Sequence, residues 1–128
     1  MKRLPLHLAA QAGDAGAILR LIEAGADPNQ KSDAGEHPLM RAAANGAVEA
    51  MTVLLDRGAE VNAATDAGNT ALMFAAARGQ IDAILLLIAR GADPARKNRF
   101  GLGAADWAQW SNRISEILPL LDKPAVSA

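Results

Sequence analysis

The chain has 128 residues, of which 51% are hydrophobic and 21% are charged, and its formal net charge at pH 7 is −1. This length fits one domain, and the hydrophobic fraction is sufficient for a buried core. The small net charge gives no overall attraction to nucleic acid or to anionic membranes, and the absence of cysteine excludes disulfide bonds and thiolate metal sites.

The start of the chain has no recognisable export signal. Met1-Lys2-Arg3 leads directly into a helical pattern, without the apolar stretch and cleavage site of a signal peptide. The longest apolar run, 81–89, is too short to span a bilayer. We therefore expect a cytoplasmic protein, or a periplasmic or exported one if a signal peptide has been removed. The alanine-rich composition without cysteine or tyrosine is associated with bacterial proteins.

Several residue types recur at intervals of 33 residues along the chain. A fixed period in this range is typical of stacked structural repeats. The interval divides the chain into units of about 1–32, 33–65, 66–98 and 99–122, which together form one domain spanning 1–122. The recurring positions include Gly25, Gly58 and Gly91; Leu6, Leu39 and Leu72; Gly13, Gly46 and Gly79; and Ile18, Met51, Ile84 and Ile117.

The first unit is expected to begin the stack. Its inward stripe is formed by Ile18, Leu21 and Ile22. Its outer side should be polar because no further unit packs against it. Gln11, Asp14, Arg20 and Glu23 fit this expectation.

The second and third units follow one pattern of loop, helix, turn and helix. Pro38 suits the first turn of a helix, and Asn45-Gly46 suits its end. A second helix follows in the same unit and ends at Gly58. The loops open with Ser32, Thr65 or Asn98, whose side chains can bond to nearby backbone and form a tight turn.

The fourth unit departs from this pattern. Asn112 replaces the recurring glycine, and Pro119 falls within the second helical stretch. Because proline removes a helical hydrogen bond, we expect that helix to be short, kinked or ended near Leu118. The tail, 123–128, is predicted to be disordered.

The repeated motifs resemble those of the ankyrin repeat family over about 4–121. The resemblance implies an all-α solenoid of four stacked helix-turn-helix units, with short β-hairpin-like loops and atypical capping units at both ends. It also implies that His7 and His37 bond between neighbouring loops and helix starts. The motifs are Leu4-Pro5-Leu6-His7-Leu8-Ala9-Ala10 with Gly25-Ala26-Asp27-Pro28-Asn29, then the segments HPLMRAA at 37–43 and TALMFAA at 70–76.

No catalytic, cofactor-binding or metal-binding pattern is present in the sequence. No pair of histidines has metal-ligand spacing, and Gly101-Leu102-Gly103 lacks the lysine of a phosphate-binding loop. Ser111 and Ser115 have no base near them in sequence. We therefore expect a protein that is not an enzyme and that needs no cofactor.

The resemblance implies that an as yet unidentified protein partner binds the loop tips and the exposed side of the first helices. No nucleic acid or membrane partner is expected. The candidate protein-binding residues on the loop tips and first helices are Asp33, Glu36, Asn45, Asp66, Asn69, Arg78, Lys97, Arg99, Phe100, Leu102 and Trp110. Lys31, Ala34, Ala44, Ala64, Ala67, Ala77 and Ser111 complete the set.

Two readings remain for the aromatic residues of the last unit. Phe100 and Trp110 can anchor a partner, because aromatic residues and arginine often dominate binding energy. Alternatively, Phe100 tucks under its own loop and Trp110 covers the end of the stack. Trp107 is expected to pack in the core, since it shares its register with Leu8 and Phe74. Arg78, Lys97 and Arg99 can also be an ordinary solvated face.

The predicted function is therefore a non-catalytic protein-interaction module that is monomeric or self-associates weakly. The alternative is a structural element that self-associates through an exposed terminal unit.

Overall fold

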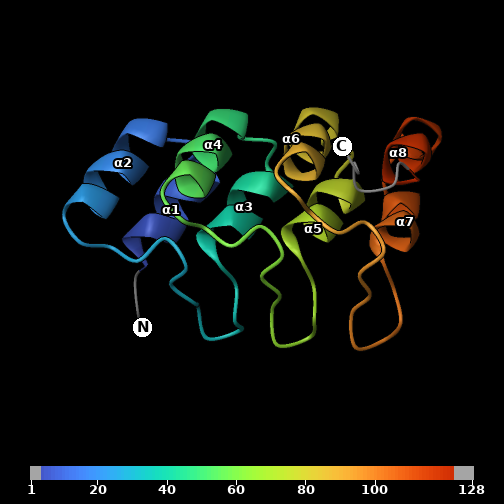
Figure 1. Cartoon of the computed structure of the whole chain (residues 1–128), viewed down its shortest axis with the longest axis horizontal. Helices are drawn as coiled ribbons and strands as arrows, with labels where there is room; N and C mark the ends of the chain where they lie inside the picture. The colour runs from blue at the N-terminus through green and yellow to red at the C-terminus, as the bar shows by residue number, and fades with distance from the viewer. Residues whose placement is uncertain (1–3, 123–128) are drawn as a thin grey trace.

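The structure, a computed structural model, describes residues 4–122, which form four successive helical units (Figure 1). Within this range there are eight α-helices, one 3₁₀ helix and no extended strand. The helices are α1 (Pro5–Ala12), α2 (Ala15–Glu23), α3 (Pro38–Ala44), α4 (Val48–Asp56), α5 (Ala71–Ala77), α6 (Ile81–Ala89), α7 (Ala104–Trp107), η1 (Ala108–Trp110) and α8 (Ile114–Leu121).

The units stack side by side in chain order. The first helices of the units, α1, α3, α5 and α7, form one row, and α2, α4, α6 and α8 form a second row beside it (Figure 1). Helix α3 packs against both α1 and α5, and α4 packs against both α2 and α6. Three long loops project to one side of the first row (Figure 1). This is the solenoid that the repeat period predicts.

Local sequence sets the helix boundaries. Pro38 occupies the first position of α3, where its missing N–H has no intrahelical partner to lose. At the start of α5, Thr70 Oγ1 accepts a hydrogen bond from the Met73 backbone N–H at 3.4 Å. The turn after α3 places Gly46 at a φ of 68°, a left-handed conformation that favours glycine.

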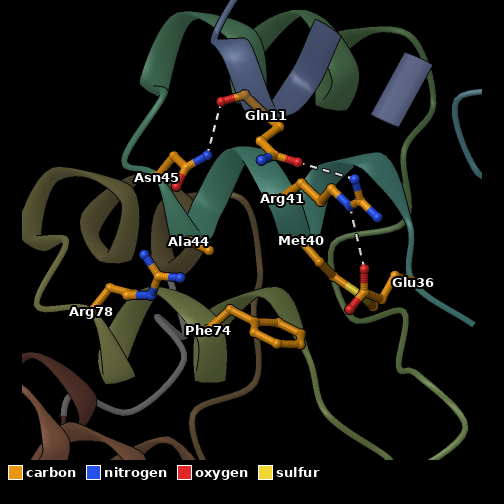
Figure 2. A pocket seen from close by; sticks show the side chains of 8 residues that line it. All are labelled: Gln11, Glu36, Met40, Arg41, Ala44, Asn45, Phe74 and Arg78. Atoms are coloured by element: carbon orange, nitrogen blue, oxygen red, sulfur yellow. Dashed lines mark hydrogen bonds and ion pairs between the residues drawn. The ribbon is translucent and has the colours of Figure 1, made fainter. Parts of the chain in front are cut away.

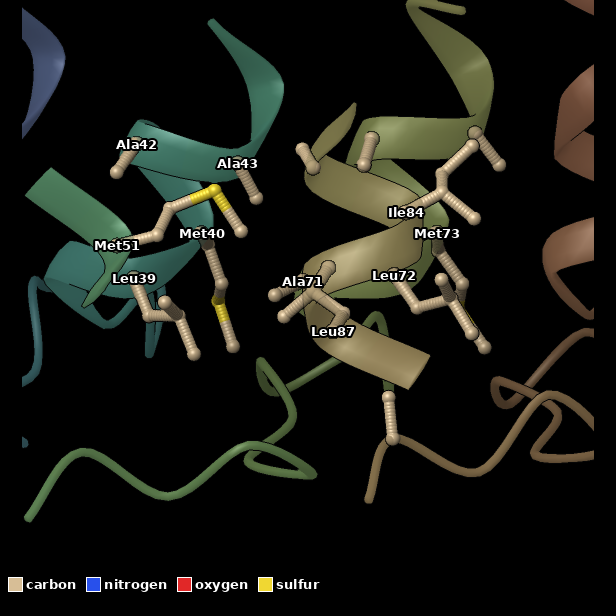
Figure 3. Close-up of a cluster of buried hydrophobic side chains, with 14 of the residues drawn as sticks. Leu39, Met40, Ala42, Ala43, Met51, Ala71, Leu72, Met73, Ile84 and Leu87 are labelled. Atoms are coloured by element: carbon tan, nitrogen blue, oxygen red, sulfur yellow. The ribbon is translucent and has the colours of Figure 1, made fainter. Parts of the chain in front are cut away.

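Small side chains let the helices approach closely. Ala42 and Ala43 of α3 are fully buried, and Met51 of α4 lies beside them (Figure 3). Leu54 and Leu87 are also fully buried, as expected of a shared interior. Leu21 is only partly buried, although it packs against the same core, because the first unit has a neighbour on one side.

Each loop is closed by the side chain that opens it, as the sequence predicts. Ser32 Oγ accepts a hydrogen bond from the Glu36 N–H at 3.1 Å. Thr65 and Asn98 do the same four residues further along in their own loops. Two isolated antiparallel bridges occur, between Ala64 and Thr70 and between Lys97 and Gly103. The loops are therefore hairpin-like without being extended strands.

Neighbouring units are also joined by backbone and amide hydrogen bonds. In the loops, the Arg99 N–H donates to the Ala67 carbonyl at 2.9 Å. On the side of the second helices, Asn62 Nδ2 donates to the Gly91 carbonyl at 3.1 Å, and Asn62 Oδ1 accepts from the Asp93 N–H at 2.8 Å. Both kinds of contact connect residues about one unit apart, so they fix the stacking distance between units.

The fourth unit keeps its place in the stack but has a different first helix. Helix α7 is four residues long and passes into the 3₁₀ helix η1. The expected end of the last helix near Leu118 is wrong, because α8 continues through Pro119 to Leu121. Ser115, whose carbonyl would otherwise pair with residue 119, is exposed, so water can satisfy it. Leu121 is buried and anchors the helix end.

The predicted tail, 123–128, lies outside the described residues. Across residues 4–122, no helix combines the length and apolar character needed to cross a membrane.

Candidate protein-binding surface

The side of the stack that carries the loops and first helices contains a shallow groove of about 310 Å³, here called the inner groove (Figure 2). It crosses α1, α3 and α5, so three units contribute to it. Its lining residues are Gln11, Glu36, Met40, Arg41, Ala44, Asn45, Phe74 and Arg78.

One end of the inner groove is held by a polar network between the first two units. Arg41 Nε contacts Glu36 Oε1 at 3.3 Å, and Arg41 Nη1 donates to Gln11 Oε1 at 3.1 Å. Asn45 Nδ2 donates to the Gln11 backbone carbonyl at 2.8 Å. Figure 2 shows these three contacts, while Arg78 lies at the other end of the groove, away from them. The Arg41 charge is thus largely compensated within the protein.

Two further grooves adjoin the inner groove among the loops. The loop groove, of about 390 Å³, is lined by Ala34, Glu36, Thr65, Asp66, Ala67, Asn69 and Phe74. The N-terminal groove, of about 380 Å³, is lined by Leu4, Lys31, Ser32, Asp33, Ala34, Glu36 and Arg41. All three grooves include Glu36, and the inner and loop grooves share Phe74. They therefore form one connected surface, here called the inner surface.

His7 fixes the backbone at the centre of this surface. Its Nε2 lies 2.7 Å from the Glu36 carbonyl oxygen, so Nε2 is the ring nitrogen that carries and donates the proton. The His7 Nδ1 atom is buried and has no hydrogen-bond partner within residues 4–122. Burial lowers the pKa of His7 below its ordinary value, although the bond to Glu36 opposes the shift. The bond between loop and helix start that the resemblance implies for His7 is confirmed.

His37 occupies the corresponding position in the second unit and is also buried. Its Nδ1 atom has no partner in the described part of the chain. Burial lowers the pKa of His37, with a smaller contribution from the positive charge of Lys31. Within residues 4–122 no hydrogen bond joins the His37 ring to a neighbouring loop, so the bond that the resemblance implies is found for His7 and not for His37.

Three aromatic rings continue the surface toward the last unit. The Phe74 and Trp107 ring centroids are 6.5 Å apart, and those of Trp107 and Trp110 are 5.2 Å apart in an edge-to-face arrangement. The buried indole N–H of Trp107 has no acceptor within residues 4–122, so packing alone holds this ring there. The aromatic rings thus connect the inner groove to the last unit.

The structure brings about half of the predicted binding residues together. Those that line the connected grooves are Asp33, Glu36, Asn45, Asp66, Asn69 and Arg78. Lys97, Arg99, Phe100, Leu102 and Trp110 belong to the last unit and its loop and line none of the three grooves. Phe100 is 77% exposed, so it does not tuck under its loop, and Trp110 is 59% exposed.

Sequence reasoning missed four residues that line the inner groove, Gln11, Met40, Arg41 and Phe74, and also Leu4, Ser32 and Thr65 in the two other grooves. The expectation that Leu8, Phe74 and Trp107 share a core register is wrong for Leu8, which is 53% exposed. Phe74 and Trp107 are partly buried against the core. The exposure of this repeat position could have been predicted from the sequence, because Arg41 occupies it in the second unit, and an arginine is rarely buried.

Within residues 4–122, no three His, Asp or Glu side chains come together in a way that could hold a metal ion. Of the ionisable residues of the grooves, Glu36 and Arg41 form an ion pair within the second unit, and Lys31, Asp33, Asp66 and Arg78 are exposed to solvent.

Comparison with known proteins agrees with this geometry. A family model of ankyrin repeats, in three copies, matches residues 6–98. No significant match was found among curated protein sequences. The matched region covers nearly all of the first three units and every groove residue except Leu4, while the fourth unit lies beyond it. Because the match covers most of the chain, this protein belongs to the ankyrin repeat family.

Proposed function

We propose that the chain is a non-catalytic interaction module that binds a protein partner along its inner surface. Ankyrin repeats generally mediate protein–protein interaction. The observation that carries the proposal for this chain is the continuity of three grooves, which are contributed by three units and joined at Glu36 and Phe74.

The groove chemistry suits a polypeptide better than a small substrate. The inner groove combines an apolar floor, including Met40 and Phe74, with the exposed charge of Arg78. It is shallow and open, so it does not exclude water as a catalytic cavity does. An extended segment of a partner can place apolar side chains against the floor and polar groups along the rim.

Phe100 and Trp110 are proposed as anchors of the same interaction. Both are large and aromatic, with Phe100 77% and Trp110 59% exposed, and aromatic residues often dominate binding energy. Lys97, Arg99 and Leu102 accompany Phe100 in its loop. The proposed binding surface therefore extends beyond the grooves into the last unit.

The proposal is tested by affinity capture from the native host, followed by titration of the captured protein. Phe100→Ala and Trp110→Ala should each weaken binding by about 2 kcal/mol or more. Leu85→Ala is a matched control, because Leu85 is 47% exposed but belongs to the second row of helices. Unchanged affinity in the double variant, with the fold retained, would remove the aromatic anchors from the proposal.

A second candidate function is self-association through the last unit. It is favoured by the exposure of Trp110, Ile114 and Leu118, which are 59%, 38% and 37% accessible. Sedimentation at micromolar concentration would then show a dimer that Trp110→Lys dissociates. A monomer at that concentration would count against this candidate. The cytoplasmic location expected from the sequence stays a prediction.

A further inference from the structure

The charges of the inner surface and of the adjoining loop, which carries Lys97 and Arg99, are unevenly compensated. Arg41, in the second unit, contacts Glu36 and is neutralised there. Arg78, Lys97 and Arg99 are all exposed, and within residues 4–122 none of them forms a salt bridge. Lys31, in the N-terminal groove, is also exposed and forms no salt bridge within residues 4–122, so the larger group of uncompensated cations, but not all of them, lies in the third unit and in the loop that follows it.

Within residues 4–122, none of the three carboxylates of the last unit, Asp106, Glu116 and Asp122, forms a salt bridge with these cations. Asp106 Oδ2 accepts a hydrogen bond from the Gly103 N–H at 2.8 Å, at the start of α7, and is committed to that contact. Arg113 and Glu116 face each other at 4.0 Å in α8. Asp33 and Asp66 belong to the two preceding loops, and Asp93, in the same loop as Lys97 and Arg99, accepts a hydrogen bond from the Ala95 N–H at 2.9 Å and forms no salt bridge with either cation.

An apolar surface lies beside Arg78. Phe74 lies on α5 and Arg78 caps the end of this helix four residues later, so their side chains lie on the same side, and both line the inner groove. Phe74 contacts Trp107, which contacts Trp110. Trp110 takes the register that Ala44 and Ala77 hold in the preceding units, so a large ring replaces a methyl group at this end of the surface.

We propose that this end of the inner surface recognises an acidic peptide segment that carries an aromatic or aliphatic side chain. The proposal rests on the protein-binding function proposed above and names the chemistry of the partner. Carboxylates of the segment pair with Arg78 and with Lys97 or Arg99 of the adjacent loop. Its apolar side chain packs against Phe74 and Trp110.

Charge complementarity selects a peptide over a nucleic acid. A polyanion needs a continuous row of cations, whereas here the basic end of the surface gives way to Asp33 and Asp66 in the earlier loops. The formal net charge of −1 also opposes long-range attraction of a polyanion. A short acidic segment can instead contact the basic end without extending over the acidic loops.

The test is selection of a displayed random dodecapeptide library on the wild-type protein. Aspartate and glutamate should be enriched over the starting library, together with one aromatic or aliphatic position. A synthetic peptide from the selected pool should bind about tenfold or more weakly to Arg78→Glu and to Trp110→Ala. Its affinity should fall as salt concentration rises, because the paired charges are exposed.

Matched variants control for charge and for surface loss. Arg57→Glu makes the same charge change at the exposed end of α4, and Leu85→Ala removes an exposed apolar side chain from α6. Neither should change peptide affinity. Circular dichroism of each variant confirms that the fold is retained.

The outcomes separate this inference from the general function. The acidic-peptide inference is overturned if the selected peptides show no acidic enrichment, or if the affinity of acidic peptides is unaffected by Arg78→Glu. In either case the proposed protein-binding function stands if Phe74→Ala or Trp110→Ala still lowers the affinity of the selected peptides. If the selected peptides bind Arg78→Glu, Phe74→Ala and Trp110→Ala as tightly as the wild type, the proposed protein-binding function is overturned as well. A library that yields no binder overturns the acidic-peptide inference. If an oligo(dT) strand binds more tightly than the selected peptide, nucleic-acid recognition replaces the inference.

Discussion

Two glycines at the same place in successive loops should respond very differently to an added methyl group. Gly68 and Gly101 have similar left-handed backbone conformations, with φ of 86° and 76°. A Cβ at Gly68 would lie 3.0 Å from the Asn98 Cα and 3.2 Å from the Arg99 nitrogen of the next loop, whereas a Cβ at Gly101 would meet no atom within 4 Å. Gly68→Ala therefore tests loop stacking, and Gly101→Ala is its control.

The expected cost follows from separating the two effects. The left-handed conformation costs alanine about 1–2 kcal/mol in both variants. Only Gly68→Ala adds a close contact with backbone, which costs about 1–3 kcal/mol more. The neighbouring loop cannot yield easily, because Asn98 bonds to Asn69 at 2.8 Å and the Arg99 N–H bonds to Ala67 at 2.9 Å. We expect a loss of about 2–5 kcal/mol for Gly68→Ala.

The measurement is urea unfolding of both variants and the wild type, followed by circular dichroism and by tryptophan fluorescence. Circular dichroism follows all the helices, whereas both tryptophans, Trp107 and Trp110, report on the last unit. Coincident transitions allow the free energies of unfolding to be compared directly. Equal destabilisation by the two substitutions would show that the loops do not stack as described, and the account of the inner surface would lose its basis.

Two further perturbations test the core and the buried imidazoles. Leu54→Ala should lower the free energy of unfolding by about 2–5 kcal/mol, since Leu54 is fully buried between units; a change below about 1 kcal/mol in urea unfolding would contradict that burial. Stability should also fall as the pH drops from 7.5 to 5.5, because burial lowers the pKa of His7 and His37 and the unfolded chain binds protons more readily below about pH 6.5. His7→Gln, which can still donate to the Glu36 carbonyl, should reduce this pH dependence of the urea midpoint; an unchanged dependence would exclude His7 as a contributor.

Local sequence patterns predicted the fold with few errors. The helix starts at Pro38 and the ends near Gly46 depend on residues close together in the chain, so they could be read directly. The same holds for the loops closed by Ser32 and Thr65. The exception was α8, where the proline rule was applied without knowing that the affected carbonyl is exposed and that Leu121 is buried.

The binding surface was less predictable because it depends on contacts between units. The sequence placed Asp33 and Arg78 on the right side of the stack, but it did not reveal that Phe74 joins two grooves. It also did not reveal that Arg41 is compensated by Glu36 whereas Arg78 is not, since both are arginines on the exposed side of a first helix.

The sequence by itself therefore determined the number of units, their phase and their helices, because a period of 33 residues and short-range turn signals encode these features. Only the tertiary structure decided which residues, among those at the same position in different units, face solvent, contact a neighbouring unit or line a groove. Gly68 and Gly101 show the reason most directly. Their local conformations are alike, and only the loop packed against Gly68, about 30 residues away in sequence, makes them different.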